Sequence, residues 1–142
     1  MFSNCKQLTT ICQIPATTLM EGCYEGMFHG CDSLTTIPSN LLPATTLADY
    51  CYSSMFSDCI SLHTICNLPA TTLMEGCYLS MFSGCLSIKL SETQTTEYSI
   101  AYRIPVTDTG ITATDALTNM FASTSGTFIG TPDLNQTYYL YD

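Results

Sequence analysis

The chain has 142 residues, of which 46% are hydrophobic and 11% are charged. This length suits one domain, and the apolar share leaves no reason to expect disorder. Only three residues are Lys or Arg, and the net charge is −9. Nucleic acids and anionic membrane surfaces are therefore poor partners, because both are bound by clusters of basic side chains. No apolar run approaches the roughly 20 residues that span a bilayer, so we expect no membrane insertion.

A repeat of 26 to 28 residues runs through the first two thirds of the chain. The string Pro-Ala-Thr-Thr-Leu-Met-Glu-Gly-Cys-Tyr occupies 15–24 and again 69–78, with a diverged copy at 43–52. Each copy precedes a Met-Phe pair and a further Cys, and the chain opens on the same pair. A fixed period of this length is typical of stacked repeat proteins. No signal peptide is visible, but the chain starts inside a repeat, so we expect a longer natural gene product or an excised or mature fragment.

Each repeat is predicted to contain a short amphipathic helix, most clearly over 18–30. Thr18 and Glu21 fit a capping box, and Gly30 is placed to end the helix in a left-handed conformation. Gly84 and Asp58 take the place of Gly30 in the other copies. On a helical wheel the Leu, Cys, Met, Tyr and Phe residues share one half, which predicts a wide buried face.

A four-residue stretch rich in β-branched residues follows each predicted helix and predicts a short strand. These stretches are 8–11, 34–37 and 62–65. One strand and one helix cannot bury their apolar faces alone, whereas neighbours stacked in parallel can.

The helix ends Phe28-His-Gly-Cys-Asp-Ser-Leu34 and Phe82-Ser-Gly-Cys-Leu-Ser-Ile88 resemble the BspA-like leucine-rich repeats, which are common in surface proteins of gut and oral bacteria. The resemblance covers residues 1–88. It implies that the strands line a concave binding face and that the side chains beside the strand leucines point to solvent. The binding residues implied are Thr9, Thr10, Thr35, Thr36, His63 and Thr64.

The C-terminal third, residues 89–142, is predicted to cap the array, since repeat arrays need atypical ends. Segments 87–92 and 97–104 predict a β-hairpin, 113–121 is a worn repeat with Thr124 at the Cys position, and 137–141 suits a last strand. The expected fold class is therefore an α/β solenoid: a leucine-rich-repeat-like stack of about three strand–helix repeats over 1–88, with a β-rich cap over 89–142.

The nine cysteines fall into columns when the repeats are aligned. Two columns lie on or beside the predicted buried face, where a thiol acts as a small apolar group. Disulfides along or between columns are the alternative, and an odd total leaves at least one thiol unpaired. Metal binding is disfavoured because no close Cys pair occurs. Cys12 and Cys66 are expected to face outward, and His63 near Cys66 raises a thiol enzyme as a weak alternative.

The sequence contains no recognisable catalytic constellation and implies no cofactor. The favoured hypothesis is a non-catalytic binding or adhesion module that presents its Thr-rich face to a protein or glycan on a host or neighbouring cell. The expected location is extracellular or at a cell surface. The alternative is a structural spacer, or a phage tail-fibre-like segment, within a longer surface protein.

Overall fold

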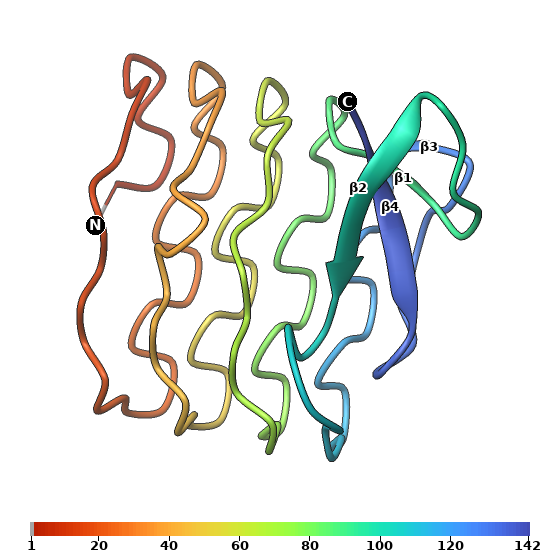
Figure 1. Ribbon diagram of the computed structural model, residues 1–142. Coiled ribbons are helices and arrows are strands. Elements are labelled where there is room, and N and C mark those ends of the chain that lie inside the picture. Colours follow the sequence, from red (N-terminus) through yellow and green to blue (C-terminus); the bar gives the residue numbers. More distant parts are fainter. Residues whose placement is uncertain (1) are drawn as a thin grey trace.

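The computed structural model describes residues 2–142, which wind into a stack of coils that runs from the N-terminus to the C-terminus (Figure 1). The described chain contains no helix, and hence none that could cross a membrane. Its strands are β1 (Lys89–Ser91), β2 (Tyr98–Arg103), β3 (Ser125–Gly126) and β4 (Thr137–Tyr141). The expected α/β solenoid of leucine-rich, strand–helix repeats is therefore wrong, although the repeats do stack.

The segments expected to be helical form one side of the stack, which we call the turn wall. It consists of residues 2–5, 20–31, 48–59, 74–85 and 113–124. Within 20–31, each odd-numbered N–H from Cys23 to Cys31 donates to the carbonyl three residues earlier, at 3.1–3.2 Å. Every fourth residue has a positive φ, as at Gly22, Gly26 and Gly30. The wall is thus a run of tight turns of the kind that need a positive φ.

The remaining N–H groups of the turn wall join one coil to the next. Within 20–31, the N–H groups of alternate residues from Gly22 to Gly30 donate to carbonyls of the following coil at 2.8–3.0 Å. The coils 48–59 and 74–85 repeat this pattern at 2.7–3.1 Å. From Gly22, Tyr50 and Gly76 onward, the backbone donors of these three coils thus alternate between bonds inside their own coil and bonds to the neighbour, and the coils are held in strict register.

The helix prediction failed because the apolar spacing is four residues rather than 3.6. Leu19, Cys23, Met27 and Cys31 follow one another at exact intervals of four. Glycine at every fourth position costs a helix about 1 kcal/mol each, while the turns use its positive φ. Thr18 is exposed and caps nothing. The positive φ expected at Gly30, Asp58 and Gly84 is confirmed, but each lies in a turn.

The opposite side of the stack is extended but forms no strand over 8–11, 34–37 or 62–65, contrary to the prediction. Hydrogen bonds between these segments are sparse. His63 N–H donates to the Thr35 carbonyl at 3.1 Å, and Asn67 N–H donates to the Ser39 carbonyl at 2.8 Å. Spacing between these bonds is too wide for a ladder, so the segments lie side by side without becoming a sheet.

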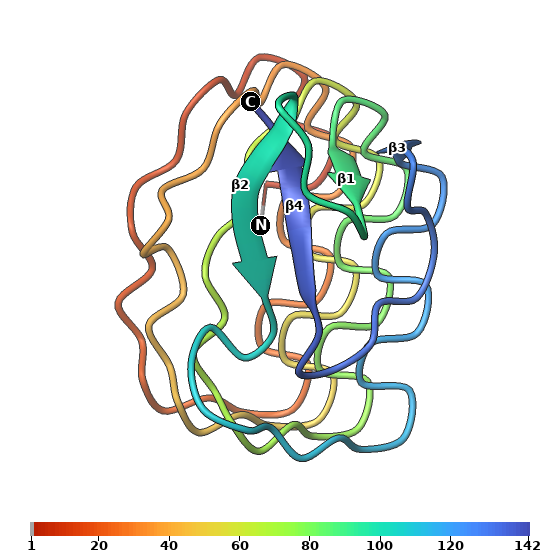
Figure 2. The same ribbon diagram turned by 45° about the vertical axis from the view of Figure 1, so that its right-hand side comes forward.

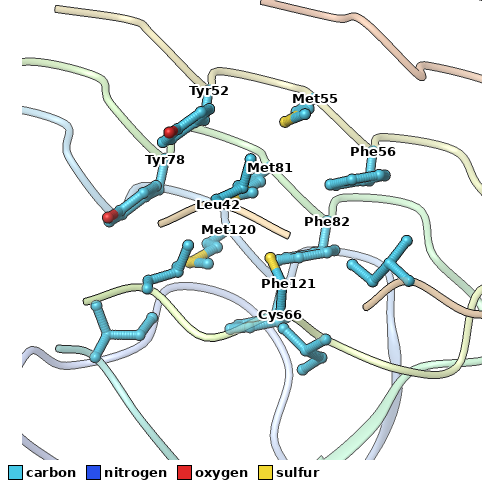
Figure 3. Packing of buried hydrophobic residues seen from close by; sticks show 14 of the residues in the cluster. Leu42, Tyr52, Met55, Phe56, Cys66, Tyr78, Met81, Phe82, Met120 and Phe121 are labelled. Carbon is cyan, nitrogen blue, oxygen red and sulfur yellow. The ribbon is translucent and has the colours of Figure 1, made fainter. Parts of the chain in front are cut away.

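The core is built from columns of identical side chains, one per coil (Figure 3). Successive Phe rings of the turn wall stack with centroids 5.4–5.7 Å apart and planes within 8°. A shorter Tyr column runs parallel to it, with centroids 6.0 and 6.2 Å apart. The Phe column comprises Phe2, Phe28, Phe56, Phe82 and Phe121, and the Tyr column Tyr24, Tyr52 and Tyr78. Met55 and Met81 are fully buried beside them, which confirms the predicted core role of the Met-Phe pairs.

Glycine is required at Gly84 for a second reason besides its positive φ. The Asp58 side chain of the preceding coil lies where a Cβ on Gly84 would stand. Asn4 bears the same relation to Gly30. A side chain in one coil thus alternates with glycine in the next, which lets the backbones approach closely.

The C-terminal region adds a sheet of order β2-β4-β1-β3. β4 lies between β1 and β2, antiparallel to both, so the predicted hairpin of these two segments is wrong. The last strand over 137–141 is confirmed. Residues 113–124 form a further coil, in which Phe121 stacks on Phe82. Figure 2 shows β2 and β4 lying across the mouth of the stack.

Candidate functional site

The side chains expected to form a binding row are mostly solvent-exposed on the extended side of the stack. Thr9, Thr10, Thr35, Thr36 and His63 are exposed. The four threonine side chains make no hydrogen bond within the described residues, so their hydroxyl groups are free for a ligand. The bond from His63 N–H to the Thr35 carbonyl places these two positions in adjacent coils.

Thr64 is different from the rest of the row. It is half-buried, and its Oγ1 accepts a hydrogen bond from the Ile37 N–H at 2.9 Å. The same hydroxyl lies 3.4 Å from the Ile37 carbonyl, to which it can donate. Thr64 therefore joins two coils, and its hydroxyl is committed to the fold.

A hollow of about 380 Å³ lies where the row meets the C-terminal sheet. Its lining residues are His63, Leu86, Ser87, Lys89, Tyr141 and Asp142. Lys89 is the first residue of β1 and Tyr141 the last of β4, so pairing of these two strands fixes the hollow's wall. The hollow therefore extends the predicted row with an aromatic ring, an ammonium group and a carboxylate.

Lys89 carries the basic charge in the hollow. Its Nζ lies 4.6 Å from the centroid of the Tyr141 ring, a cation–π contact. The other two Lys and Arg side chains are engaged elsewhere: Lys6 pairs with Asp32 at 2.8 Å, and Arg103 Nη1 donates to the Pro105 carbonyl at 2.9 Å. Within residues 2–142, Lys89 is the basic side chain whose ammonium has neither a carboxylate nor a carbonyl partner.

The hollow was only partly predictable from the repeat. Lys89 follows His63 by 26 residues, as Thr35 follows Thr9, so extending the register by one coil would have placed it in the row. Ser87 bears the same relation to Ser61. Tyr141 and Asp142 carry no such signal, because pairing of β4 with β1 is what brings them here.

The cysteines are structural. All nine are free thiols, and Cys31, Cys59 and Cys85 donate from Sγ to the Phe carbonyl of the preceding coil at 3.0–3.1 Å. Burial raises the pKa of Cys59 to about 12. The buried-thiol prediction is confirmed for the columns, while Cys5 and Cys23 at the N-terminal end are half-buried.

Cys12 and Cys66 occupy equivalent positions but differ in exposure. Cys12 is exposed as expected, whereas Cys66 is fully buried, so the prediction of an outward Cys66 is wrong. β2 covers it: the Tyr102 hydroxyl donates to the Cys66 carbonyl at 3.1 Å. Burial raises the Cys66 pKa to about 12. A thiol of this kind supplies almost no nucleophilic thiolate at neutral pH.

The described residues contain no group of three or more His, Cys, Asp or Glu side chains placed to hold a metal ion. No family model matches the chain, and neither a curated protein nor a solved structure is detectably similar to it. The resemblance to BspA-like repeats thus remains an untested prediction from the motifs.

Proposed function

We propose that the chain is a non-catalytic binding module whose ligand, a glycan or a protein, lies along the exposed hydroxyl row and in the adjoining hollow. The observation that carries the proposal is the continuity of Thr9, Thr35 and His63 with the hollow lined by Lys89 and Tyr141. These side chains stand on coils locked in register, so the surface is held ready before a ligand arrives.

The chemistry of the hollow suits a hydroxyl-rich ligand. Sugar hydroxyl groups both donate and accept hydrogen bonds. Lys89 supplies donors. The Ser87 hydroxyl, which donates to the Ile60 carbonyl at 2.8 Å, and the Asp142 carboxylate supply acceptors. Tyr141 adds an aromatic side chain that is 45% exposed at the rim. A protein loop with a carboxylate could also use Lys89, which is why both ligand classes belong to the proposal.

A binding module of this kind belongs at a cell surface or outside the cell, and we propose that location. The large uncharged hydroxyl surface fits contact with hydrated polymers. Nucleic acid is not proposed as a ligand, because a chain with net charge −9 repels a phosphate backbone.

The test is binding of the fluorescently labelled chain to a printed glycan array and to a panel of extracellular matrix proteins. The first variant replaces two exposed row residues, Thr9→Glu with Thr35→Glu. The second opens the hollow, Lys89→Ala with Tyr141→Ala. We expect each variant to lose at least about tenfold in affinity for any ligand found, because each removes or blocks contacts at the centre of the surface.

The matched control is Thr17→Glu with Thr45→Glu, which places the same charges at exposed positions of the connector. It should bind like the unmodified chain. Equal loss in the control would show that charge alone weakens binding, and unchanged binding in both test variants would refute this choice of surface. A chain that binds nothing on either panel would favour the structural-spacer alternative.

A further inference from the structure

One position of the repeat changes its chemistry along the stack. Thr9, Thr35, His63 and Lys89 occupy this position in successive coils, and all four are exposed. The next residue of the column is Ser125, which pairs with Lys89 where β1 and β3 run in parallel. The column therefore passes from neutral hydroxyl groups to an imidazole and then to an ammonium group, and the last two line the hollow.

The Lys89 ammonium is held in place without being neutralised. Its Nζ lies 4.6 Å from the centroid of the Tyr141 ring, and the Tyr98 ring packs edge-on against Tyr141 with centroids 5.5 Å apart. No carboxylate of residues 2–142 lies within 4.0 Å of this Nζ. An aromatic ring attracts an ammonium through its quadrupole but carries no negative charge. The donors of Lys89 are therefore positioned and still available to a ligand.

The carboxylate that lines the hollow is turned away from this ammonium. The Asp142 N–H donates to the Glu97 carbonyl at 2.9 Å, and its Oδ2 lies 3.5 Å from the Ser99 hydroxyl of β2. Asp142 and Lys89 thus share the wall of the hollow without forming an ion pair. In a chain with 12 Asp and Glu residues, the hollow is where a negative group on a ligand would meet an unpaired positive one.

A single ammonium beside a row of hydroxyl groups narrows the class of ligand. One positive charge matches one carboxylate, whereas the net charge of −9 would repel a sulfated chain that carries a charge on every sugar. The free hydroxyl groups of Thr9 and Thr35 can both donate and accept, as sugar hydroxyl groups do. A glycan that carries carboxylates therefore matches the row and the hollow together.

We propose that the hollow recognises a sugar that bears a carboxylate, such as a uronic acid or a sialic acid residue. This inference rests on the proposed function and names its ligand class. The sugar carboxylate accepts charge-assisted hydrogen bonds from Lys89 Nζ. A ring hydroxyl donates to Ser87 Oγ, whose own proton is given to the Ile60 carbonyl. The rest of the glycan lies along the threonine row.

The experiment compares matched glycans that differ only in the charge of the carboxyl group. Oligosaccharides of galacturonic acid, glucuronic acid and sialic acid are printed beside their methyl esters, and binding of the labelled chain is measured over a range of concentrations. We expect at least one acid to bind about fivefold or more tightly than its own ester, because a hydrogen bond to a charged group is the stronger kind. Tetraglutamate, which has carboxylates without sugar hydroxyl groups, should compete more weakly than that acid.

Three exposed charges are changed one at a time to locate the effect. Lys89→Gln should abolish the difference between acid and ester. Asp142→Asn should enlarge the difference, because it removes a like charge from the wall of the hollow. Lys6→Gln is the matched control: it removes the same charge as Lys89→Gln, from a lysine that pairs with Asp32, and should leave the difference unchanged.

The outcomes separate this inference from the proposed function. Equal binding of every acid and its ester overturns the carboxylate assignment alone, and so does a preference for the acid that survives Lys89→Gln. Stronger competition by tetraglutamate also overturns it and favours an acidic protein segment as the ligand. If no glycan binds but a matrix protein does, the inference fails and the binding module stands. If neither panel is bound, both fail.

Discussion

The two ends of the stack differ in whether equivalent repeat residues are covered. At the C-terminal end, Tyr102 of β2 covers the interior and hydrogen-bonds to the Cys66 carbonyl. At the N-terminal end, the equivalent thiol of Cys12 lies at an open hollow, and Phe2 is 44% exposed. Identical repeat residues are thus core or surface according to what lies beyond them. Burial in a stacked repeat is a property of the neighbour as much as of the sequence.

The largest expected effect is alkaline unfolding driven by the inner thiols. Burial raises the pKa of Cys51 to about 11 and those of Cys59, Cys66 and Cys77 to about 12, from an ordinary value of 9.0. Above pH 9 the unfolded chain releases protons that the folded chain retains, so the free energy of unfolding falls as pH rises. Each thiol contributes about 1.4 kcal/mol per pH unit until its folded pKa is reached.

We therefore expect stability to be constant below about pH 8 and to collapse between pH 9 and 11. Urea denaturation at a series of fixed pH values, monitored by circular dichroism, measures the free energy of unfolding at each pH. Replacing Cys5, Cys12 and Cys23, the thiols of the open end, with serine should leave the pH at which stability collapses unchanged. Replacing Cys66 with alanine should make the decline less steep. A triple variant that abolishes the decline would contradict the contrast between the two ends.

The second prediction compares the middle and the open end of the Phe column. Phe56 stacks on both neighbours and is fully buried, so Phe56→Ala should cost about 3–5 kcal/mol. Phe2 has one stacking partner and is partly exposed, so Phe2→Ala should cost less than about 1.5 kcal/mol. Equilibrium denaturation of the two variants measures both values. Equal losses would mean that the open end is as well packed as the middle.

The repeat explains how far the sequence alone could be interpreted. Its period, its core columns and the positive φ at Gly30 and Gly84 were predictable, because they follow from spacing and residue type. The helix prediction was wrong because an apolar spacing of four residues stays close to the 3.6-residue period of a helix for only about two turns. The segments form tight turns instead. Strict intervals of four, with a turn-forming residue at every fourth place, were the signal that separates the two.

The candidate site was likewise only partly predictable from the sequence. Exposure of Thr9 and Thr35 was expected from the resemblance to BspA-like repeats, whereas the hollow depends on β4 pairing with β1. That pairing joins residues about 50 apart, and no local pattern specifies it. The burial of Cys66 was not predictable for the same reason, since the residue that covers it belongs to β2 and not to its own repeat.

The third prediction concerns a variant that opens the closed C-terminal end of the stack. Tyr102→Ala removes the ring that covers Cys66 and packs edge-on against Phe121 at 6.4 Å. The free energy of unfolding should fall by about 3 kcal/mol, the lower part of the range for removing a buried aromatic ring, because water can enter at the rim. Cys66 should also become reactive to iodoacetamide at pH 8, as we expect of the exposed Cys12. Continued protection of Cys66 would show that other residues close this end.

The smallest effect comes from comparing two buried tyrosine hydroxyls. Tyr102 donates to the Cys66 carbonyl at 3.1 Å, whereas the Tyr78 hydroxyl is buried without a hydrogen-bond partner among the described residues. Tyr102→Phe should therefore lose about 1 kcal/mol. Tyr78→Phe keeps the stacked ring and removes an unsatisfied polar group, so it should be neutral or stabilise the chain by up to about 1 kcal/mol. Thermal denaturation of both variants gives the comparison directly, and a clear loss for Tyr78→Phe would mean that its hydroxyl has a partner in solution.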